Sequence, residues 1–273
     1  MAAPYDGAVV VVTGASSGIG LELARQMAPR AKAIALVARR EERLDALAKE
    51  LRERYPSCRV LVHKADLCDL DQAAAMIDAV EAELGPIDVL VNNAGFGDVG
   101  VFDLADWDKL ARMIQLNVTA LTFLTHRVLP GMYARRKGGV LNVSSGFGLQ
   151  WMPAFAAYVG TKHYVTSFTE SLRVEAALHG VTVTQVCPGP VDTEFEQVAE
   201  NPTGHSPPSF VRISAERCAR EALRGFERGR AIVVPGVVMK LVLASGAVTP
   251  RWFLRLLYRP VARWMREREL AAR

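Results

Sequence analysis

Short runs of apolar, mostly β-branched residues recur along the chain, and longer segments with helical periodicity separate them. Apolar runs without polar alternation are typical of strands buried on both faces of a parallel sheet. They predict strands over residues 8–12, 33–38, 60–62, 87–91, 140–143, 181–186 and 231–234. The intervening segments predict helices that end near 28 or span 41–55, 69–84, 107–136, 155–178 and 214–226. This alternation predicts a doubly wound, Rossmann-like α/β fold, with about seven parallel strands and helices on both faces.

Two segments depart from the alternation. Residues 188–213 have no periodicity and contain five prolines. Because a loop of this length in a compact domain usually has a function, we predict a lid there. Residues 236–273 are predicted to form a helical C-terminal extension. Since no composition change marks a boundary, residues 1–273 are predicted to form a single domain.

Charge and composition narrow the class of protein. The chain has 273 residues, half of them hydrophobic, which is enough for one large core. The net charge of +4 is uneven, because residues 251–273 hold seven arginines against two glutamates, a net of +5, which leaves −1 for the other 250 residues. The main body is therefore not predicted to bind nucleic acid. The cysteines and histidines have no metal-ligand spacing, so no metal site is predicted.

The location of the protein is predicted from three further observations. Residues 1–7 lack the basic region followed by an apolar one that marks a signal peptide. The apolar run 232–248 is interrupted by Pro235 and Lys240 and falls short of the about 20 apolar residues that a membrane-spanning helix needs. Four cysteines without disulfide spacing suit a reducing compartment. We therefore expect a cytoplasmic protein.

Candidate chemistry centres on Tyr158 and Lys162, which share one face of a predicted helix because they are four residues apart. A positive charge beside a phenol favours the phenolate, so we expect the pKa of Tyr158 to fall from about 10 toward neutrality, as proton transfer requires. Ser145 follows a predicted strand, at the sheet edge where ligands bind in α/β folds. Taken alone, a pair like Tyr158 and Lys162 is more often an ordinary surface pair of an amphipathic helix.

A glycine-rich turn follows the first predicted strand. Gly14, Gly18 and Gly20 would allow a tight turn and let backbone N–H groups approach a pyrophosphate at the start of the next helix. Their spacing is G-x-x-x-G-x-G, which differs from the usual dinucleotide fingerprint, and a simple turn is the alternative.

The residues at the end of the second predicted strand indicate which dinucleotide the protein binds. An acidic residue there would bind the adenosine ribose, but Ala38 occupies the position and Arg39 and Arg40 follow. A guanidinium without a nearby carboxylate favours a 2′-phosphate, so NADP(H) is predicted over NAD(H), with Arg39 as its contact. The alternative is that these arginines only begin the next helix, above all Arg40.

An ordered set of motifs over roughly residues 8–234 resembles the short-chain dehydrogenase/reductase family. The set is Thr13-Gly14-x-x-x-Gly18-x-Gly20, Asn92-Asn93-Ala94-Gly95, Asn117, Ser145, Tyr158-x-x-x-Lys162 and Pro188-Gly189. Single motifs of this kind are weak signals, whereas the ordered set is specific.

The resemblance implies roles for four catalytic residues. Tyr158 would be the general acid/base, and Lys162 would lower its pKa and bind the nicotinamide ribose. Ser145 would polarise the substrate carbonyl. Asn117 would kink its helix and hold a water that links Lys162 to solvent. The alternatives are a capping serine for Ser145 and a helix-surface amide for Asn117.

The resemblance also implies a cofactor site for NADP(H). Asp66 and Asn93 would flank the adenine, and Thr193 would contact the nicotinamide carboxamide, unless it is only a loop residue. The implied site comprises Gly14, Ser16, Ser17, Gly18, Ile19, Gly20, Arg39, Asp66, Leu67, Asn93, Ala94, Gly95, Tyr158, Lys162, Pro188, Gly189, Val191 and Thr193.

The expected activity is NADP(H)-dependent interconversion of an apolar ketone or aldehyde and its alcohol, as in a carbonyl reductase. Large apolar side chains are predicted to line the substrate pocket, with the core as the alternative for Phe155: Phe147, Trp151, Met152, Phe155 and Phe195. The alternative function is an NADP(H)-binding, redox-responsive scaffold protein with little or no turnover.

The last expectations concern partners. Thr249-Pro250 predicts a helix start, and arginines then recur every four residues from Arg251 to Arg263 among apolar residues. We expect the apolar residues to bury against protein, as a lid over the pocket or as a subunit contact, and the arginines to stay at the surface, available for weak contact with acidic lipid. The protein would then be peripheral to a membrane. A homo-oligomer, dimer or tetramer, is also expected, and Gly160 would permit close packing of a neighbouring helix.

Overall fold

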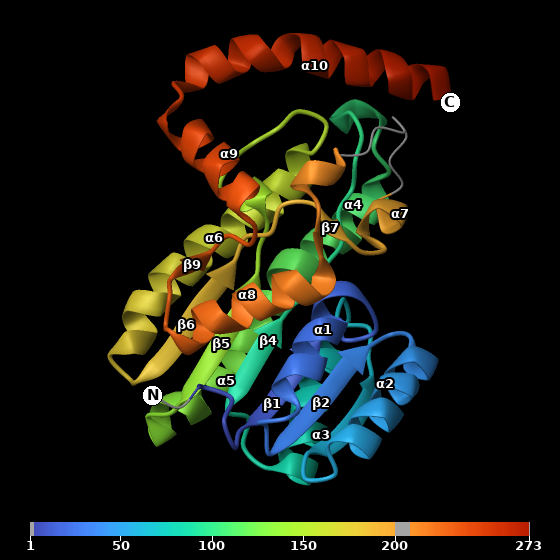
Figure 1. The fold of residues 1–273 in the computed structure, drawn as a ribbon. Coiled ribbons are helices and arrows are strands. Elements are labelled where there is room, and N and C mark those ends of the chain that lie inside the picture. Colours follow the sequence, from blue (N-terminus) through green and yellow to red (C-terminus); the bar gives the residue numbers. More distant parts are fainter. Residues whose placement is uncertain (1–2, 200–207, 273) are drawn as a thin grey trace.

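The computed structural model describes residues 3–199 and 208–272 (Figure 1). Seven parallel strands form its central sheet, in the order β3-β2-β1-β4-β5-β6-β9. Their bounds are Val9–Thr13 (β1), Ala33–Ala38 (β2), Arg59–Lys64 (β3), Val89–Asn92 (β4), Gly138–Val143 (β5), Val181–Val186 (β6) and Ile232–Val233 (β9). The predicted seven-stranded, Rossmann-like sheet is confirmed. Its strand order reverses between β1 and β4, which is where ligands bind in such sheets.

Helices cover both faces of the sheet (Figure 1). Alternate residues of β1 point to opposite sides, so Val10 and Val12 enter one apolar core and Val9 and Val11 the other. The first core is closed by α1 (Gly18–Met27), α2 (Glu41–Arg54) and α8 (Ala215–Glu227). The second is closed by α3 (Leu70–Leu84), α5 (Leu121–Arg135) and α6 (Ala156–Ala177).

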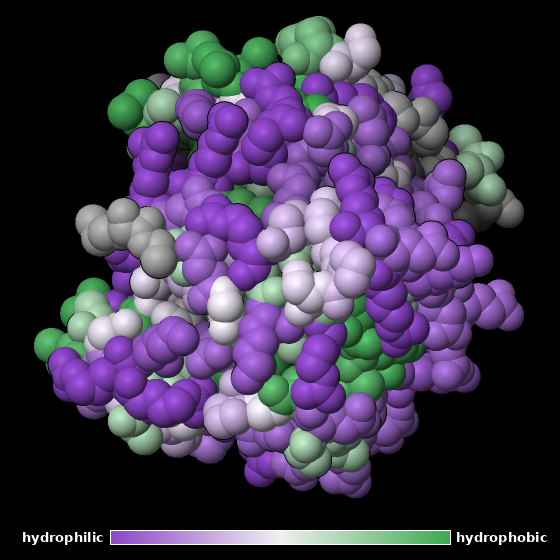
Figure 2. All heavy atoms as spheres, turned by 60° about the horizontal axis from the view of Figure 1, so that its bottom comes forward, coloured by the Kyte–Doolittle hydropathy of each residue, from purple (hydrophilic) through white to green (hydrophobic). Residues whose placement is uncertain are grey.

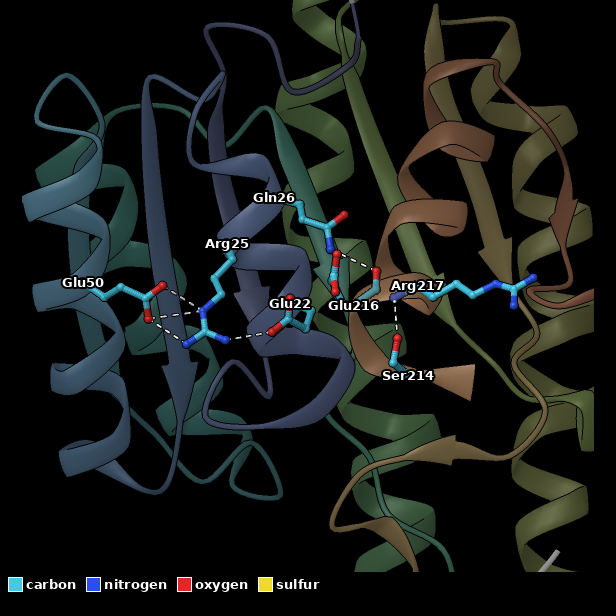
Figure 3. A network of polar contacts seen from close by, with 7 residues as sticks. All are labelled: Glu22, Arg25, Gln26, Glu50, Ser214, Glu216 and Arg217. Atoms are coloured by element: carbon cyan, nitrogen blue, oxygen red, sulfur yellow. Dashed lines mark hydrogen bonds and ion pairs between the residues drawn. The ribbon is translucent and has the colours of Figure 1, made fainter. Parts of the chain in front are cut away.

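Polar contacts hold α1 between its two neighbours (Figure 3). Arg25 of α1 pairs with Glu50 of α2 at 2.7 Å and with Glu22 at 2.8 Å. On the other side, the side-chain amide of Gln26 donates to the backbone carbonyl of Glu216 in α8. These contacts position the N-terminus of α1, which follows the glycine-rich turn.

The predicted helix over 107–136 is interrupted. It consists of α4 (Trp107–Ile114), a π-helical turn η2 (Gln115–Ala120) and α5. Asn117 lies in the turn, with only 1% of its surface exposed. A π-helical turn inserts an extra residue into the helix and often marks a functional site. Here it lets Asn117 face inward rather than remain a helix-surface amide.

The lid region is more regular than the absence of periodicity predicted. The described residues of 188–213 form β7 (Val191–Asp192), α7 (Phe195–Val198), η4 (Ser209–Val211) and the start of β8 (Ile213–Ser214). Two further short turns, η1 (Phe102–Leu104) and η3 (Gly146–Gly148), lie outside the lid. β7 and β8 pair in parallel as a small second sheet, which tethers both ends of the lid. The prolines Pro202 and Pro207 lie outside the described residues.

Two helices complete the chain, α9 (Val237–Val248) and α10 (Arg251–Ala272), and they meet at a bend of 118°. α10 lies beyond the carboxyl ends of the strands (Figure 1). Within the described residues, neither helix alone is long and apolar enough to cross a membrane, although the bent pair together passes a test of length and composition. The carboxylate of Glu269 anchors α10 by accepting from the backbone N–H of Val101 at 2.7 Å.

The expectation that the apolar residues of this extension pack on the body of the same chain is wrong for most of them, whereas their burial in a subunit contact stays a prediction. In α10, Leu254 and Met265 are buried, but Trp252 is 66% exposed and Phe253, Leu256, Leu257 and Trp264 are also exposed. The reason is geometric, because only the narrow stripe that includes Leu254, Met265 and Glu269 faces the body. Figure 2 shows a different face of the molecule, which is largely hydrophilic with smaller apolar groups.

Candidate active site

The glycine-rich turn has the backbone geometry that its glycines allow. Gly14 and Gly18 have φ values of 67° and 56°, in the left-handed region. A Cβ at Gly20 would lie 2.5 Å from the carbonyl oxygen of Gly14, so only glycine fits there. The side-chain amide of Asn93 donates to the carbonyls of Thr13 and Gly14, and therefore braces the turn from the end of β4.

The turn also presents an uncapped helix start. Ser17 precedes α1, and its side chain caps none of the helix amides. Backbone N–H groups at such a terminus carry a partial positive charge and favour an anion. Ile19 follows within the first turn of the helix and packs on the core beneath α1. The residues of the turn therefore fit the phosphates of a dinucleotide.

Arg40 begins α2, as the alternative expected, and its side chain also reaches the glycine-rich turn. Its guanidinium donates to the hydroxyl of Ser16 at 3.0 Å and to that of Ser17 at 2.7 Å, and pairs with Glu194 at 2.6 Å. Arg39 is exposed beside it. Both arginines follow the carboxyl end of β2. Their position in the sequence does not show which of the two side chains reaches the glycine-rich turn.

The side proposed for adenine is built from the ends of β3 and β4. Asp66 accepts from the backbone N–H of Cys68 and pairs with Arg112 at 2.9 Å, and these bonds hold the pKa of its carboxyl below the ordinary value despite partial burial. Leu67 is buried, and the backbone N–H of Ala94 donates to the Thr13 hydroxyl.

Ser145 and Tyr158 meet at the carboxyl end of β5. The Ser145 hydroxyl lies close enough to the Tyr158 phenol to lower its pKa. The Ser145 hydroxyl also accepts from the backbone N–H of Phe147 at 3.1 Å, so it caps the short turn η3 in addition to facing Tyr158. Both side chains are at most 9% exposed. The structure therefore brings the two hydroxyls together in a site largely shielded from water.

Lys162 lies behind this pair. Its ammonium donates to the backbone carbonyl of Val143 at 2.9 Å and lies 5.8 Å from the ring centre of Tyr158. Burial lowers the pKa of Lys162 to about 8. Burial also raises the pKa of Tyr158 to about 12, against a smaller lowering by Ser145. The expected fall of the Tyr158 pKa is therefore wrong for the protein alone, because desolvation by burial is the largest cause and raises the pKa.

Asn117 connects the π-helical turn to this centre. Its side-chain amide donates to the carbonyl of Phe96 and the hydroxyl of Thr161, and its oxygen accepts from the N–H of Phe96. A Cβ at Gly95 would lie 2.8 Å from that oxygen and 3.6 Å from the Lys162 nitrogen. Gly95 thus permits Asn117 and Lys162 to approach the same backbone.

Aromatic side chains surround the Tyr158 ring. Phe195 lies 5.5 Å and Phe147 6.2 Å from it, between ring centres, and Phe155 packs on Phe147 at 4.8 Å. Trp151 instead packs edge-on against Tyr258 of α10 at 5.0 Å. Met152 is half-buried. Three of the five predicted pocket residues therefore gather at the candidate catalytic tyrosine.

The chain after β6 closes the site from the other side. The carbonyl of Pro188 accepts from the backbone N–H of Gly146 at 2.6 Å, and Val191 enters the small sheet through its pairing with Ile213. Met239 of α9 packs against Gly189, where a Cβ would lie 2.7 Å from its side chain.

Comparison with known proteins identifies the family. Residues 8–203 match the family model described as short chain dehydrogenase. The chain belongs to the short-chain dehydrogenase/reductase family. It is 39% identical, over 71% of its length and 75% of the relative, to an NADP-dependent 3-hydroxy acid dehydrogenase of Schizosaccharomyces pombe. The predicted membership of this oxidoreductase family is confirmed.

Solved structures of the family share the fold. A short-chain dehydrogenase from Sphingobium yanoikuyae in complex with NADPH is 31% identical, with a TM-score of 0.78 over 91% of this chain and 95% of that one. A bulky-bulky ketone specific alcohol dehydrogenase from Comamonas testosteroni is 28% identical, with a TM-score of 0.74 over 87% and 91%.

Proposed function

We propose that the protein is an NADP(H)-dependent oxidoreductase that interconverts an apolar ketone or aldehyde and the corresponding alcohol. The cofactor part is supported by the glycine-rich turn and the arginines at the end of β2, and by the NADPH complex of the Sphingobium relative. The substrate part is supported by the aromatic side chains at Tyr158 and by the bulky-ketone specificity of the Comamonas relative.

The bound nicotinamide supplies or accepts the hydride at its C4 atom. In reduction, the Tyr158 phenol gives its proton to the carbonyl oxygen, while the Ser145 hydroxyl donates a hydrogen bond to the oxyanion that develops there. The raised pKa of Tyr158 keeps the phenol protonated near neutral pH, so the proton that reduction requires is present on the phenol. The Lys162 ammonium stabilises negative charge on the ring that has lost its proton.

The gathering of Ser145, Tyr158 and Lys162 in one buried site carries this proposal. The test is a panel of ketones and aldehydes with small and large apolar substituents, followed by NADPH absorbance, with NADH alongside. Turnover with NADPH is expected, faster for substrates with large apolar groups. Turnover only with small polar carbonyls would contradict the substrate class.

The alternative of a redox-responsive scaffold gives a different result in the same panel. It would bind NADPH, as shown by titration of the cofactor fluorescence, without oxidising it with any member of the panel. The complete set of Asn117, Ser145, Tyr158 and Lys162 favours the enzyme, because a scaffold has no need for a buried proton donor.

We also propose that the protein is cytoplasmic and that α9 and α10 rest on an anionic membrane surface. Val237, Leu241 and Val248 form an exposed apolar stripe on α9, and α10 adds exposed apolar residues such as Trp252. The arginines of α10 supply charge that complements acidic lipid headgroups, which argues for lipid over another protein as the occupant.

A homo-oligomer is proposed as well, a dimer or a tetramer, as is common in the family. The support is the exposed apolar surface of α6, where Val174 and Leu178 are more than 70% exposed. No other segment of the described chain comes within 4 Å of a Cβ built at Gly160, so the close neighbour expected there would have to be a second copy. Sedimentation velocity tests this proposal, and a monomer at micromolar concentration would reject it.

A further inference from the structure

Residues 193–195 of the lid contact three different parts of the site. The Thr193 side chain packs on Gly18 at the glycine-rich turn, where a Cβ would lie 2.9 Å from it. The Phe195 ring packs on Tyr158. Glu194, between them, reaches α2 and its preceding loop. Its neighbours therefore hold the backbone of Glu194 over the turn that is proposed to bind the cofactor.

Glu194 forms an ion-pair cluster with Arg40 and Arg43, which we call the Glu194 cluster. One carboxylate oxygen lies 2.6 Å from a guanidinium nitrogen of Arg40, and the other lies 2.5 Å from one of Arg43. These bonds hold the pKa of the Glu194 carboxyl at about 2, so it is ionised throughout the physiological range. The three side chains are 34–49% exposed, so a solute can reach them.

The same Arg40 guanidinium donates to the hydroxyls of Ser16 and Ser17. A cleft of about 840 Å³ adjoins the cluster, and its lining includes Ser16, Ser17, Arg43 and Glu194 but not Arg40. Serine hydroxyls and guanidinium groups together are the donors that a phosphate monoester prefers. The carboxylate of Glu194 thus lies on donors that suit a 2′-phosphate.

We infer that Glu194 is a specificity-determining residue, which competes with the 2′-phosphate of NADP(H) for Arg40 and Arg43. The inference rests on the proposed NADP(H) dependence. A phosphate dianion accepts stronger charge-assisted hydrogen bonds than a carboxylate and displaces it, at a cost in affinity. A bare ribose hydroxyl carries no charge and leaves the cluster intact. Glu194 therefore weakens the binding of phosphate-bearing ligands and leaves those without the 2′-phosphate nearly unaffected.

The test uses ligands that carry the adenosine end alone. Adenosine 2′,5′-bisphosphate and adenosine 5′-monophosphate are titrated calorimetrically into the full chain, as wild type and as Glu194→Gln, at one ionic strength. The bisphosphate is expected to bind the variant at least about threefold more tightly, because half-exposed ion pairs are modest in strength. The affinity for the monophosphate is expected to change less than about twofold, because this ligand has no 2′-phosphate to compete with Glu194.

A matched control separates this competition from a general loss of negative charge. Glu216→Gln removes a carboxylate of α8 that pairs with Arg220 at 2.7 Å and lies outside the Glu194 cluster and the lining of the cleft. It is expected to leave both ligands unchanged. Equal tightening in both variants, or no tightening in Glu194→Gln, would overturn the inference.

Failure of the proposed cofactor has a separate signature. A wild type that binds the bisphosphate no more tightly than the monophosphate contradicts the NADP(H) preference, and with it the role of Glu194. A wild type that prefers the bisphosphate, together with an unchanged Glu194→Gln, rejects the role of Glu194 alone.

Discussion

The ammonium of Lys162 lies 5.8 Å from the ring centre of Tyr158, and its hydrogen bond goes to the backbone carbonyl of Val143. The charge therefore faces the ring and is held by the end of β5. Since both groups are buried, each is pushed toward its neutral form, the phenol by a raised pKa and the amine by a lowered one. Desolvation is therefore the main cause of both pKa shifts, that of the Tyr158 phenol and that of the Lys162 ammonium.

Lys162 should make the stability of the protein depend on pH. Its pKa is about 8 in the folded protein and about 10.4 when unfolded, so the unfolded chain binds more protons between these values. Folding stability of the wild type, relative to Lys162→Met, should therefore rise by about 2 kcal/mol from pH 7 to pH 9.5. Urea unfolding at the two pH values measures it. The exposed control Lys49→Met should show no such rise, and a flat difference for Lys162→Met would contradict the buried ammonium.

Tyr158→Phe should abolish most turnover while the cofactor still binds. The substitution keeps the ring, its contacts with Phe147 and Phe195, and the fold, but removes the proton donor. General acid catalysis is typically worth about 10²–10⁴-fold, so kcat should fall by at least this range. Tyr164→Phe on the same helix, whose hydroxyl contacts Thr122, is the control and should keep full activity. Substantial activity of Tyr158→Phe with saturating NADPH would reject the assignment.

Arg40→Ala should weaken NADPH more than NADH. A hydrogen bond to a charged group contributes about 1.5–3 kcal/mol, and the lower end applies at this half-exposed site, so the selective loss should be about tenfold. Arg39→Ala and Ala38→Asp should act in the same direction. Fluorescence titration of both cofactors measures the change. Arg54→Ala, at the far end of α2, should alter neither affinity, and a wild type that prefers NADH would refute the prediction.

The C-terminal helices should bind anionic vesicles at low salt and release them at high salt. Replacing Arg255, Arg259 and Arg263 by glutamine should weaken binding by roughly 100-fold, because each basic residue near the surface contributes about 1 kcal/mol. Vesicle sedimentation with phosphatidylserine and phosphatidylcholine measures it. Absence of binding to the anionic vesicles at low salt rejects the membrane proposal.

A second triple variant controls for the loss of charge itself. Arg217, Arg220 and Arg224 belong to α8 and not to α9 or α10. Their replacement by glutamine lowers the net charge by the same amount. This variant should bind vesicles as the wild type does, and an equal loss would show attraction of the whole protein instead of contact through α10.

The sheet was predictable from sequence because β-branched runs buried on both faces have few alternatives. Residues 33–38 and 181–186 form strands with the predicted bounds. The face of α10 that packs on the body was not predictable, because the apolar residues of this helix form two stripes. Leu254 and Met265 lie on one, and Phe253, Leu257 and Trp264 on the other, and periodicity does not say which faces the body.

The candidate site was predictable as a set of motifs but not as a set of distances. Spacing placed Tyr158 and Lys162 on one helix face, yet the direction of the Tyr158 pKa depends on burial and on which atom the ammonium faces. The contact of Arg40 with the glycine-rich turn was not predictable for a similar reason. Two adjacent arginines follow β2, and only the side-chain direction shows that Arg40 reaches the Ser16 hydroxyl.

Met239 of α9 lies against two glycines of the catalytic centre. A Cβ at Gly146, next to Ser145, would come 3.0 Å from the terminal methyl of Met239, and Gly189 touches the same side chain. The C-terminal extension therefore forms part of the wall of the catalytic chamber. Removal of the extension would leave a gap beside Ser145. A shortened chain would therefore accept substrates of other shapes, in addition to losing the surface that the extension provides.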